Sequence, residues 1–161
     1  MLLEGRGEAE EARGRGGAGG AKGSRMSGDV AWGACCNEAG ASTVAGFGGL
    51  DIVVNDAGIQ VVRGRLTDID DAEWERVTQT NLKAPFMVGQ VVARSMIDNG
   101  RKGSIINFGS IQAGQVLPGR THYAPTKRGV EALTRNMAVE LAPHGIRVNC
   151  LQPGLIDTAQ I

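Results

Sequence analysis

Short apolar runs alternate with longer helical patterns from Asp29 onward, and this alternation limits what the chain of 161 residues can fold into. The apolar runs are rich in β-branched residues and stop at turn-forming residues, which predicts strands at 50–55, 104–108 and 146–151. Apolar residues at spacings of three and four predict helices at 67–98 and 122–141. Buried strands separated by helices favour an α/β fold with a parallel, doubly wound sheet.

Turn-forming and polar residues follow each of the predicted strands. Asn55-Asp-Ala-Gly58 follows the first strand, Ser110 the second and Pro153-Gly154 the third. Right-handed crossovers between parallel strands bring the carboxyl ends of all three to one edge of the sheet. Open α/β sheets bind their ligands at that edge, so the sequence predicts a binding site there.

Residues 1–28 differ in composition from residues 29–161. Nine of the first 28 residues are glycine, five are Lys or Arg, and four are Glu. Such a segment buries too little apolar surface to offset its conformational entropy, so we expect 1–28 to be disordered and 29–161 to form one domain. The stretch Gly14-Arg-Gly-Gly-Ala-Gly19 matches G-x-G-x-x-G, but it lacks the preceding strand and following helix of a phosphate-binding loop.

Charge and composition exclude several classes of protein. The formal net charge is zero, so we expect neither a nucleic acid nor a membrane as partner. No apolar run approaches the roughly 18 residues of a membrane-spanning helix. The three cysteines have the spacing of neither a disulfide framework nor a metal site, which predicts a cytoplasmic protein with reduced thiols and no metal.

Ser110, Tyr123 and Lys127 have the order and spacing of an active site. Tyr123 and Lys127 lie four positions apart at the start of a predicted helix and therefore share one face of it. An ammonium group beside a phenol favours the phenolate and lowers the phenol pKa from about 10, which makes tyrosine usable as an acid or base near neutral pH. Taken singly, the serine is typical of a turn, and the Tyr/Lys pair is typical of a surface contact.

Four motifs follow one another in the chain from about Asp29. They are Asn55-Asp-Ala-Gly58, Asn81, Ser110 with Tyr123-x-x-x-Lys127, and Pro153-Gly154-x-x-x-Thr158. In this order they resemble the motifs of the classical short-chain dehydrogenase/reductase family. The resemblance implies a Rossmann-type sheet and reversible hydride transfer between an alcohol or carbonyl and NAD or NADP.

The family resemblance assigns a role to each of four catalytic residues. It implies that Tyr123 is the general acid/base, that Ser110 hydrogen-bonds the substrate oxygen, and that Asn81 holds a water in the proton relay. It also implies that Lys127 lowers the tyrosine pKa and binds the nicotinamide ribose. Pro85 fits this assignment, because a proline has no N–H to pair with the carbonyl of Asn81 four residues earlier.

The same resemblance implies a site for the nicotinamide cofactor along the predicted strand ends. The residues that match it are Asp29, Val30, Asn55, Ala57, Gly58, Tyr123, Lys127, Pro153, Gly154, Ile156 and Thr158. The family normally distinguishes NAD from NADP after its second strand, which has no match here, so either cofactor is expected.

The chain departs from the family pattern at three places. Asp56 replaces an asparagine and adds a charge near the expected path of the cofactor. Pro125 lies inside the Tyr-x-x-x-Lys motif, in a first helical turn that tolerates proline. The family's opening strand with its Gly-x-x-x-Gly-x-Gly turn has no match, so we interpret the chain as a fragment without the first βαβα portion that binds NAD(P) weakly.

Two functions of different classes remain open. The chain is an oxidoreductase acting on a small-molecule alcohol or carbonyl, or it is a non-catalytic, truncated remnant that is at most an oligomerisation module. Gly58-Ile-Gln60 and Ser110-Ile-Gln-Ala resemble the sugar-acid and polyol branch of the family, such as the gluconate 5-dehydrogenases, and more loosely the 3-oxoacyl-carrier-protein reductases.

Two further expectations concern association and the histidines. The helices at 82–98 and 122–141 form subunit interfaces in the family, which implies a homo-oligomer. The first of them carries an apolar stripe made of Val88, Val91, Val92 and Met96. His122 and His144 fit no metal or triad pattern, so we predict that both are solvated.

Overall fold

A computed structural model describes residues 3–4, 23–24, 26–30, 33–61 and 65–156. Its strands are β1 (Leu3–Glu4), β2 (Met26–Ser27), β3 (Ile52–Asn55), β4 (Gly103–Phe108) and β5 (Ile146–Leu151). Its α-helices are α1 (Gly33–Phe47), α2 (Asp71–Thr78), α3 (Ala84–Asp98) and α4 (Ala124–Leu141). Short helical turns are η2 (Leu66–Asp68), the π-helical η3 (Gln79–Lys83), η4 (Ile111–Ala113) and η5 (Ala142–His144).

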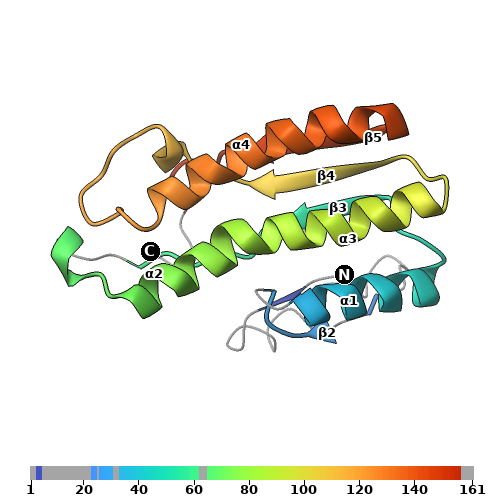
Figure 1. Cartoon of the computed structure of the whole chain (residues 1–161), viewed down its shortest axis with the longest axis horizontal. Coiled ribbons are helices and arrows are strands. Elements are labelled where there is room, and N and C mark those ends of the chain that lie inside the picture. The colour runs from blue at the N-terminus through green and yellow to red at the C-terminus, as the bar shows by residue number, and fades with distance from the viewer. Residues whose placement is uncertain (1–2, 5–22, 25, 31–32, 62–64, 157–161) are drawn as a thin grey trace.

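Strands β3, β4 and β5 form a parallel sheet in which β4 is central. Helices α3 and α4 lie side by side over one face of this sheet, and α1 runs beside α3 (Figure 1). The predicted α/β fold with a parallel sheet is therefore confirmed. The predicted strand at 146–151 matches β5, whereas β3 begins two residues later than expected and β4 one residue earlier.

Two short strands lie within residues 1–28. Leu3 pairs with Met26 and Glu4 with Ser27 in a parallel arrangement separate from the main sheet. Most of the remaining segment, including the G-x-G-x-x-G match at 14–19, lies outside the described residues. The expected disorder of 1–28 stays a prediction.

The hydrophobic core lies between the main sheet and the two long helices. Val92 and Met96 of α3 pack against Ile105 of β4 and against Ile146 and Val148 of β5. Met96 and Ile105 are fully buried. Since β4 is the central strand, this contact fixes both helices over the strand that ends at Ser110.

The sheet buries one face and leaves part of the other open. Val53, Ile105 and Val148 are register neighbours, and they point to the face that the helices cover. Ile52 and Val54 alternate with Val53 along the edge strand β3, and they are 65% and 53% exposed. Side chains of a strand point alternately to opposite faces, so within the described residues this second face of β3 is solvated.

The single helix predicted at 67–98 is divided into η2, α2, η3 and α3, so that prediction is wrong in detail. The N-cap of α2 is Asp70, whose carboxylate accepts a hydrogen bond of 2.7 Å from Glu73 N, three residues after the expected helix start at 67. The π-helical turn lies directly before Pro85, whose missing N–H interrupts the regular α-helical hydrogen bonding.

Replacing Asp70 with alanine is expected to destabilise the protein by about 1 kcal/mol, because the amide of Glu73 loses its capping partner. Asp70→Asn is the matched control, since asparagine caps equally well. The free energy of unfolding in urea measures both. An alanine variant as stable as the wild type would contradict the assigned cap.

The apolar stripe of α3 is used within the chain. Val92 and Met96 belong to the core, and Val88 packs against it. Val91 approaches α1 so closely that a Cβ added at Gly40 would lie 2.9 Å from its Cγ1. The stripe that we assigned to a subunit interface therefore packs against the chain's own sheet and α1, and the expected homo-oligomer stays a prediction.

Candidate active site

Ser110 and Tyr123 lie at the carboxyl end of β4 and at the start of α4. Ser110 follows β4 as the N-cap of η4, and its buried Oγ accepts a hydrogen bond of 3.1 Å from Gln112 N. Tyr123 is the half-buried N-cap of α4, and its N–H donates to Arg120 O at 3.0 Å. Pro125 lies in the first helical turn, as expected from the sequence.

Lys127 lies one turn into α4 and is buried. Its ammonium donates a hydrogen bond of 2.8 Å to Phe108 O, at the end of β4. The ammonium also lies 5.8 Å from the centre of the Tyr123 ring. Desolvation lowers the pKa of Lys127, and the nearby charge of Asp56 opposes that shift. The tyrosine and the lysine therefore share one helix face, as their spacing predicts.

The pKa of Tyr123 is shifted in the opposite direction to the one we expected. Burial raises the pKa of Tyr123 above its ordinary value of 10.0, while hydrogen bonding to Ser110 and the charge of Arg120 lower it. In the chain as it stands, desolvation of the phenol outweighs the effect that we assigned to the lysine.

Tyr123 is the one tyrosine of the sequence, so an absorbance titration of tyrosinate reports on it alone. The folded chain is expected to titrate above pH 10.0, and the chain in denaturant near about 10. Because the folded phenol keeps its proton longer, the phenol's contribution to the free energy of unfolding decreases as the pH rises above about 10. A folded-state midpoint below that of the denatured chain would contradict the dominant role of burial.

Asn81 connects three parts of the site. It is buried in η3, its Oδ1 accepts from Ile59 N at 2.8 Å, and its Nδ2 donates to Ile59 O at 2.9 Å. Nδ2 also lies 3.3 Å from Thr126 Oγ1, and Thr126 Oγ1 donates to Tyr123 O at 2.7 Å. One amide side chain thus fixes the segment after β3 against the first turn of α4.

Gly58 lies where the segment after β3 meets the candidate residues Asn81 and Lys127. A Cβ added at Gly58 would lie 3.4 Å from Lys127 Nζ and 3.5 Å from Asn81 Oδ1. Glycine therefore leaves room next to both polar atoms. The structure brings Gly58, Asn81 and Lys127 together, as the motif order suggested.

A buried hydrogen-bond chain crosses the sheet beside the site. Asn55 Nδ2 donates to Asn107 Oδ1 at 2.8 Å, and Asn107 Nδ2 donates to Thr134 Oγ1 at 3.0 Å. Thr134 Oγ1 donates in turn to Val130 O at 2.7 Å. Asn107 is fully buried, so the chain ties the ends of β3 and β4 to α4 through groups shielded from water.

Removing the central amide by Asn107→Ala is expected to destabilise the protein by about 2 kcal/mol, since Asn55 and Thr134 lose a buried partner. Asn136→Ala is the matched control, because Asn136 is exposed and bonds only to the carbonyl of Ala132 in its own helix. Thermal unfolding compares the two variants. Equal stability of the two variants would show that the hydrogen bonds of Asn107 add nothing to the stability of the protein.

The other residues of the expected cofactor site follow strands β2, β3 and β5. Asp29 is exposed, Val30 is buried after β2, and Ala57 is half-buried after β3. Pro153 O accepts a hydrogen bond of 3.2 Å from Ile111 N, so the segment after β5 lies beside the turn that holds Ser110.

Two further residues complete that segment. Gly154 and Ile156 extend it and are exposed. Thr158 lies outside the described residues.

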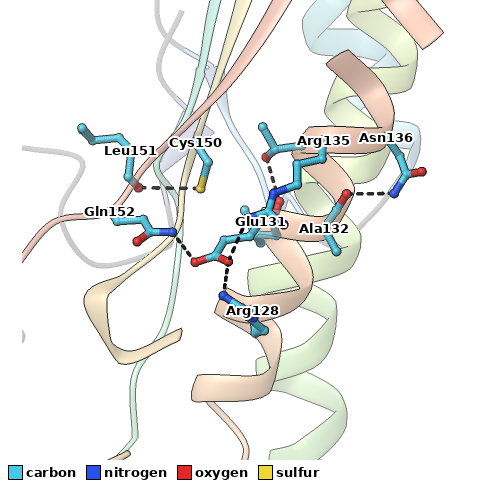
Figure 2. Close-up of polar contacts among 10 residues, drawn as sticks. Arg128, Glu131, Ala132, Arg135, Asn136, Cys150, Leu151 and Gln152 are labelled. Carbon is cyan, nitrogen blue, oxygen red and sulfur yellow. Dashed lines mark hydrogen bonds and ion pairs between the residues drawn. The ribbon is translucent and has the colours of Figure 1, made fainter. Parts of the chain in front are cut away.

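Glu131 of α4 anchors the segment that leads to Pro153 (Figure 2). Its buried carboxylate accepts a hydrogen bond from Gln152 Nε2 and forms an ion pair of 2.5 Å with Arg128. Arg135 lies 4.0 Å away on the next turn. The end of β5 is thereby fixed to the helix that carries Tyr123.

Sequence reasoning missed or misjudged three residues at the site. Arg120 lies near Tyr123 and contacts Gln60; no motif marks Arg120, and Gln60 was singled out only within Gly58-Ile-Gln60, without a role. His122, which we predicted to be solvated, is fully buried, and its Nε2 lies 3.3 Å from Glu73 Oε1 on α2. Its burial depends on the packing of α2 against the turn before α4, which sequence spacing does not reveal.

Comparison with known proteins agrees with this arrangement. A family model described as enoyl-(acyl carrier protein) reductase matches residues 3–161. Carbonyl reductase [NADPH] 2 of Sus scrofa is 39% identical over 122 residues, which are 76% of this chain and 50% of that protein. Gluconate 5-dehydrogenase of Gluconobacter oxydans (strain 621H) is 42% identical over 112 residues, or 70% of this chain and 43% of that protein.

The chain is also similar to solved structures of dehydrogenases. A gluconate 5-dehydrogenase from Burkholderia cenocepacia J2315, in complex with NADP and tartrate, is similar with a TM-score of 0.78 and 38% identity. The match covers 83% of this chain and 52% of that one. The chain thus spans about half the length of the curated relatives it matches. None of the helices among the described residues is long and apolar enough to cross a membrane. From the family-model match, these relatives and the parallel sheet, we conclude that the chain belongs to the short-chain dehydrogenase/reductase family of oxidoreductases.

Proposed function

We propose that the protein interconverts a secondary alcohol and a carbonyl compound by hydride transfer with NAD or NADP, using Ser110, Tyr123, Lys127 and Asn81. One observation carries the proposal. Residues from β4, α4 and η3 converge beside Gly58, at the carboxyl ends of β3 and β4. Ligands of parallel α/β sheets bind at that edge.

The roles follow from the contacts. The Tyr123 phenol exchanges a proton with the substrate oxygen, and hydrogen bonding to Ser110 supports its anionic form. Gln112 N uses only a lone pair of Ser110 Oγ, so the hydroxyl hydrogen, which bonds to Tyr123 in the absence of a ligand, can turn to the substrate oxygen. Asn81 holds the helix turn and the segment after β3 in place around this pair.

The described residues fit a nicotinamide cofactor on the side of Lys127. The ammonium of Lys127 is a cationic donor near Gly58, where the missing side chain leaves room for a ligand. A bound NAD or NADP would supply the hydride acceptor for oxidation and the hydride donor for reduction. Lys127 and the segment from Asn55 to Gly58 would hold it.

An assay of hydride transfer tests the proposal. The chain is mixed with NAD or NADP and a panel of secondary alcohols that includes polyols and sugar acids, and formation of the reduced nicotinamide is followed by absorbance. We expect turnover with at least one secondary alcohol and none with a tertiary alcohol, which has no hydrogen on the alcohol carbon. Absence of turnover in both this chain and a chimera carrying the N-terminal part of a related dehydrogenase would reject the proposal.

The alternative function is a non-catalytic chain. It is supported by the uncovered second face of the edge strand β3, where the apolar side chains of Ile52 and Val54 are 65% and 53% exposed. A calorimetric titration with NAD and NADP distinguishes the two functions. The non-catalytic alternative requires no binding, whereas micromolar binding of either nucleotide would exclude it and would also show that our sequence-based expectation of weak binding is wrong.

A further inference from the structure

Arg120 lies in the turn that leads into α4, three residues before Tyr123. Its carbonyl accepts hydrogen bonds from Tyr123 N at 3.0 Å and Ala124 N at 2.9 Å, which fixes the backbone of Arg120 to the start of the helix. The side chain is half-buried and so remains accessible to a ligand. Its positive charge acts on the phenol of Tyr123, whose pKa it lowers.

The guanidinium of Arg120 is held by a neutral partner. With its amide turned so that the oxygen faces the arginine, Gln60 Oε1 lies 2.7 Å from Nη1, 3.0 Å from Nη2 and 3.2 Å from Nε, in contact with the guanidinium. Gln60 belongs to the segment after β3, so this contact connects that segment to the turn before α4. A neutral amide orients the guanidinium but leaves its charge uncompensated.

Two other arginines of the chain pair with carboxylates. Arg101 pairs with Asp51 at 3.1 Å, and Arg128 pairs with Glu131 at 2.5 Å. Within the ranges that the structure describes, no carboxylate lies within ion-pair distance of Arg120. A half-buried guanidinium beside the candidate catalytic residues thus has unused capacity for an anion.

We propose that Arg120 binds the carboxylate of the substrate, which is therefore a hydroxy acid or the corresponding oxo acid, and that Gln60 is a positioning residue for the guanidinium. The inference rests on the proposed function, because it places the substrate hydroxyl at Ser110 and Tyr123. A guanidinium has a planar fork of N–H donors that matches the two oxygens of a carboxylate. The carboxylate takes no part in the bond changes and fixes the alcohol carbon relative to the phenol.

A carboxylate suits this site better than a phosphate group. Phosphate carries more charge, and its binding sites usually combine several cationic or backbone donors. The other cation among the candidate catalytic residues is Lys127, whose ammonium already donates to Phe108 O. One oriented guanidinium provides the geometry for a single, singly charged acid group.

Binding without any nucleotide tests this inference separately from catalysis. The 161-residue chain is titrated with D-gluconate, with D-glucitol as an uncharged polyol of the same carbon skeleton, and with inorganic phosphate. Chemical shifts of the arginine Nε–Hε groups are followed by nuclear magnetic resonance. Since no turnover is measured, an inactive chain leaves the result interpretable.

Three proteins are compared in the titration. In the wild type we expect gluconate to bind at least about tenfold more tightly than glucitol, because a charge-assisted hydrogen-bond pair forms only with the acid. Arg120→Gln is expected to remove that preference and to leave glucitol binding unchanged. Arg94→Gln is the matched control, since it removes the same charge from the exposed surface of α3 and should keep the wild-type preference.

Each of the other outcomes would overturn the inference. No preference for gluconate in the wild type, or the same preference in Arg120→Gln, would show that Arg120 does not bind the acid. Tighter binding of phosphate than of gluconate in the wild type would show that the group recognised is a phosphate. If Arg120→Gln fails to fold, the comparison of gluconate with glucitol in Gln60→Ala replaces it, with a weakened preference expected.

Discussion

Tyr123→Phe is expected to lower the turnover of a secondary alcohol by roughly 10²- to 10⁴-fold, the usual contribution of a positioned acid or base. Phenylalanine keeps the ring that lies near Lys127 but lacks the hydroxyl that exchanges a proton with the substrate. Tyr123 is the one tyrosine in the sequence, and its phenol is hydrogen-bonded to Ser110.

Turnover of Tyr123→Phe is measured in this chain and in the chimera described above, with Trp74→Phe as a control. Trp74 is 41% exposed on α2, so its replacement changes an aromatic side chain away from the site. We expect the control to keep most of the wild-type kcat. A Tyr123→Phe variant that does the same would remove Tyr123 from the catalytic role.

The second large effect concerns stability. Ile105→Ala is expected to destabilise the protein by about 2–5 kcal/mol, because Ile105 is fully buried in the central strand and the deletion leaves a cavity under α3 and α4. A loss of this size is a large part of the stability of a small domain. The fraction of folded chain would therefore fall sharply.

Ile52→Ala provides the matched comparison in the neighbouring strand. The same three carbon atoms are removed from a side chain that is 65% exposed, so we expect a change of at most about 0.5 kcal/mol. Urea unfolding followed by far-ultraviolet circular dichroism gives both values. Similar losses for the two variants would mean that the core does not lie where the structure places it.

Much of the fold could be predicted from the sequence because its signals are local. β-branched runs that stop at turn residues marked all three strands of the main sheet, and the matching motif order marked the edge where Ser110 and Tyr123 lie. The break between α2 and α3 was missed, since apolar residues continue at helical spacing through the π-helical turn before Pro85. A π-helical turn adds less than one full helical turn to the chain, so the spacing of apolar residues does not reveal it.

The parts of the site that sequence reasoning missed depend on tertiary contacts. The pKa of Tyr123 is set first by desolvation, and the spacing of the motif carries no information on burial. The buried His122 contacts Glu73, which lies about fifty positions earlier in the chain. The contact between Arg120 and Gln60 likewise joins the turn before α4 to the segment after β3, so no local sequence pattern predicts it.

The parallel register of the sheet has a consequence for how the chain reaches its folded state. Ile52 pairs with Ser104, and Gly103 pairs with Ile146, so every ladder of the main sheet joins residues more than forty positions apart. Contacts so distant in sequence are costly to form early, and domains dominated by them fold slowly. The central strand β4 acquires its second neighbour only when Ile146–Leu151 has been synthesised. During translation, the apolar side chains of β4 therefore stay exposed until that segment can pack beside them.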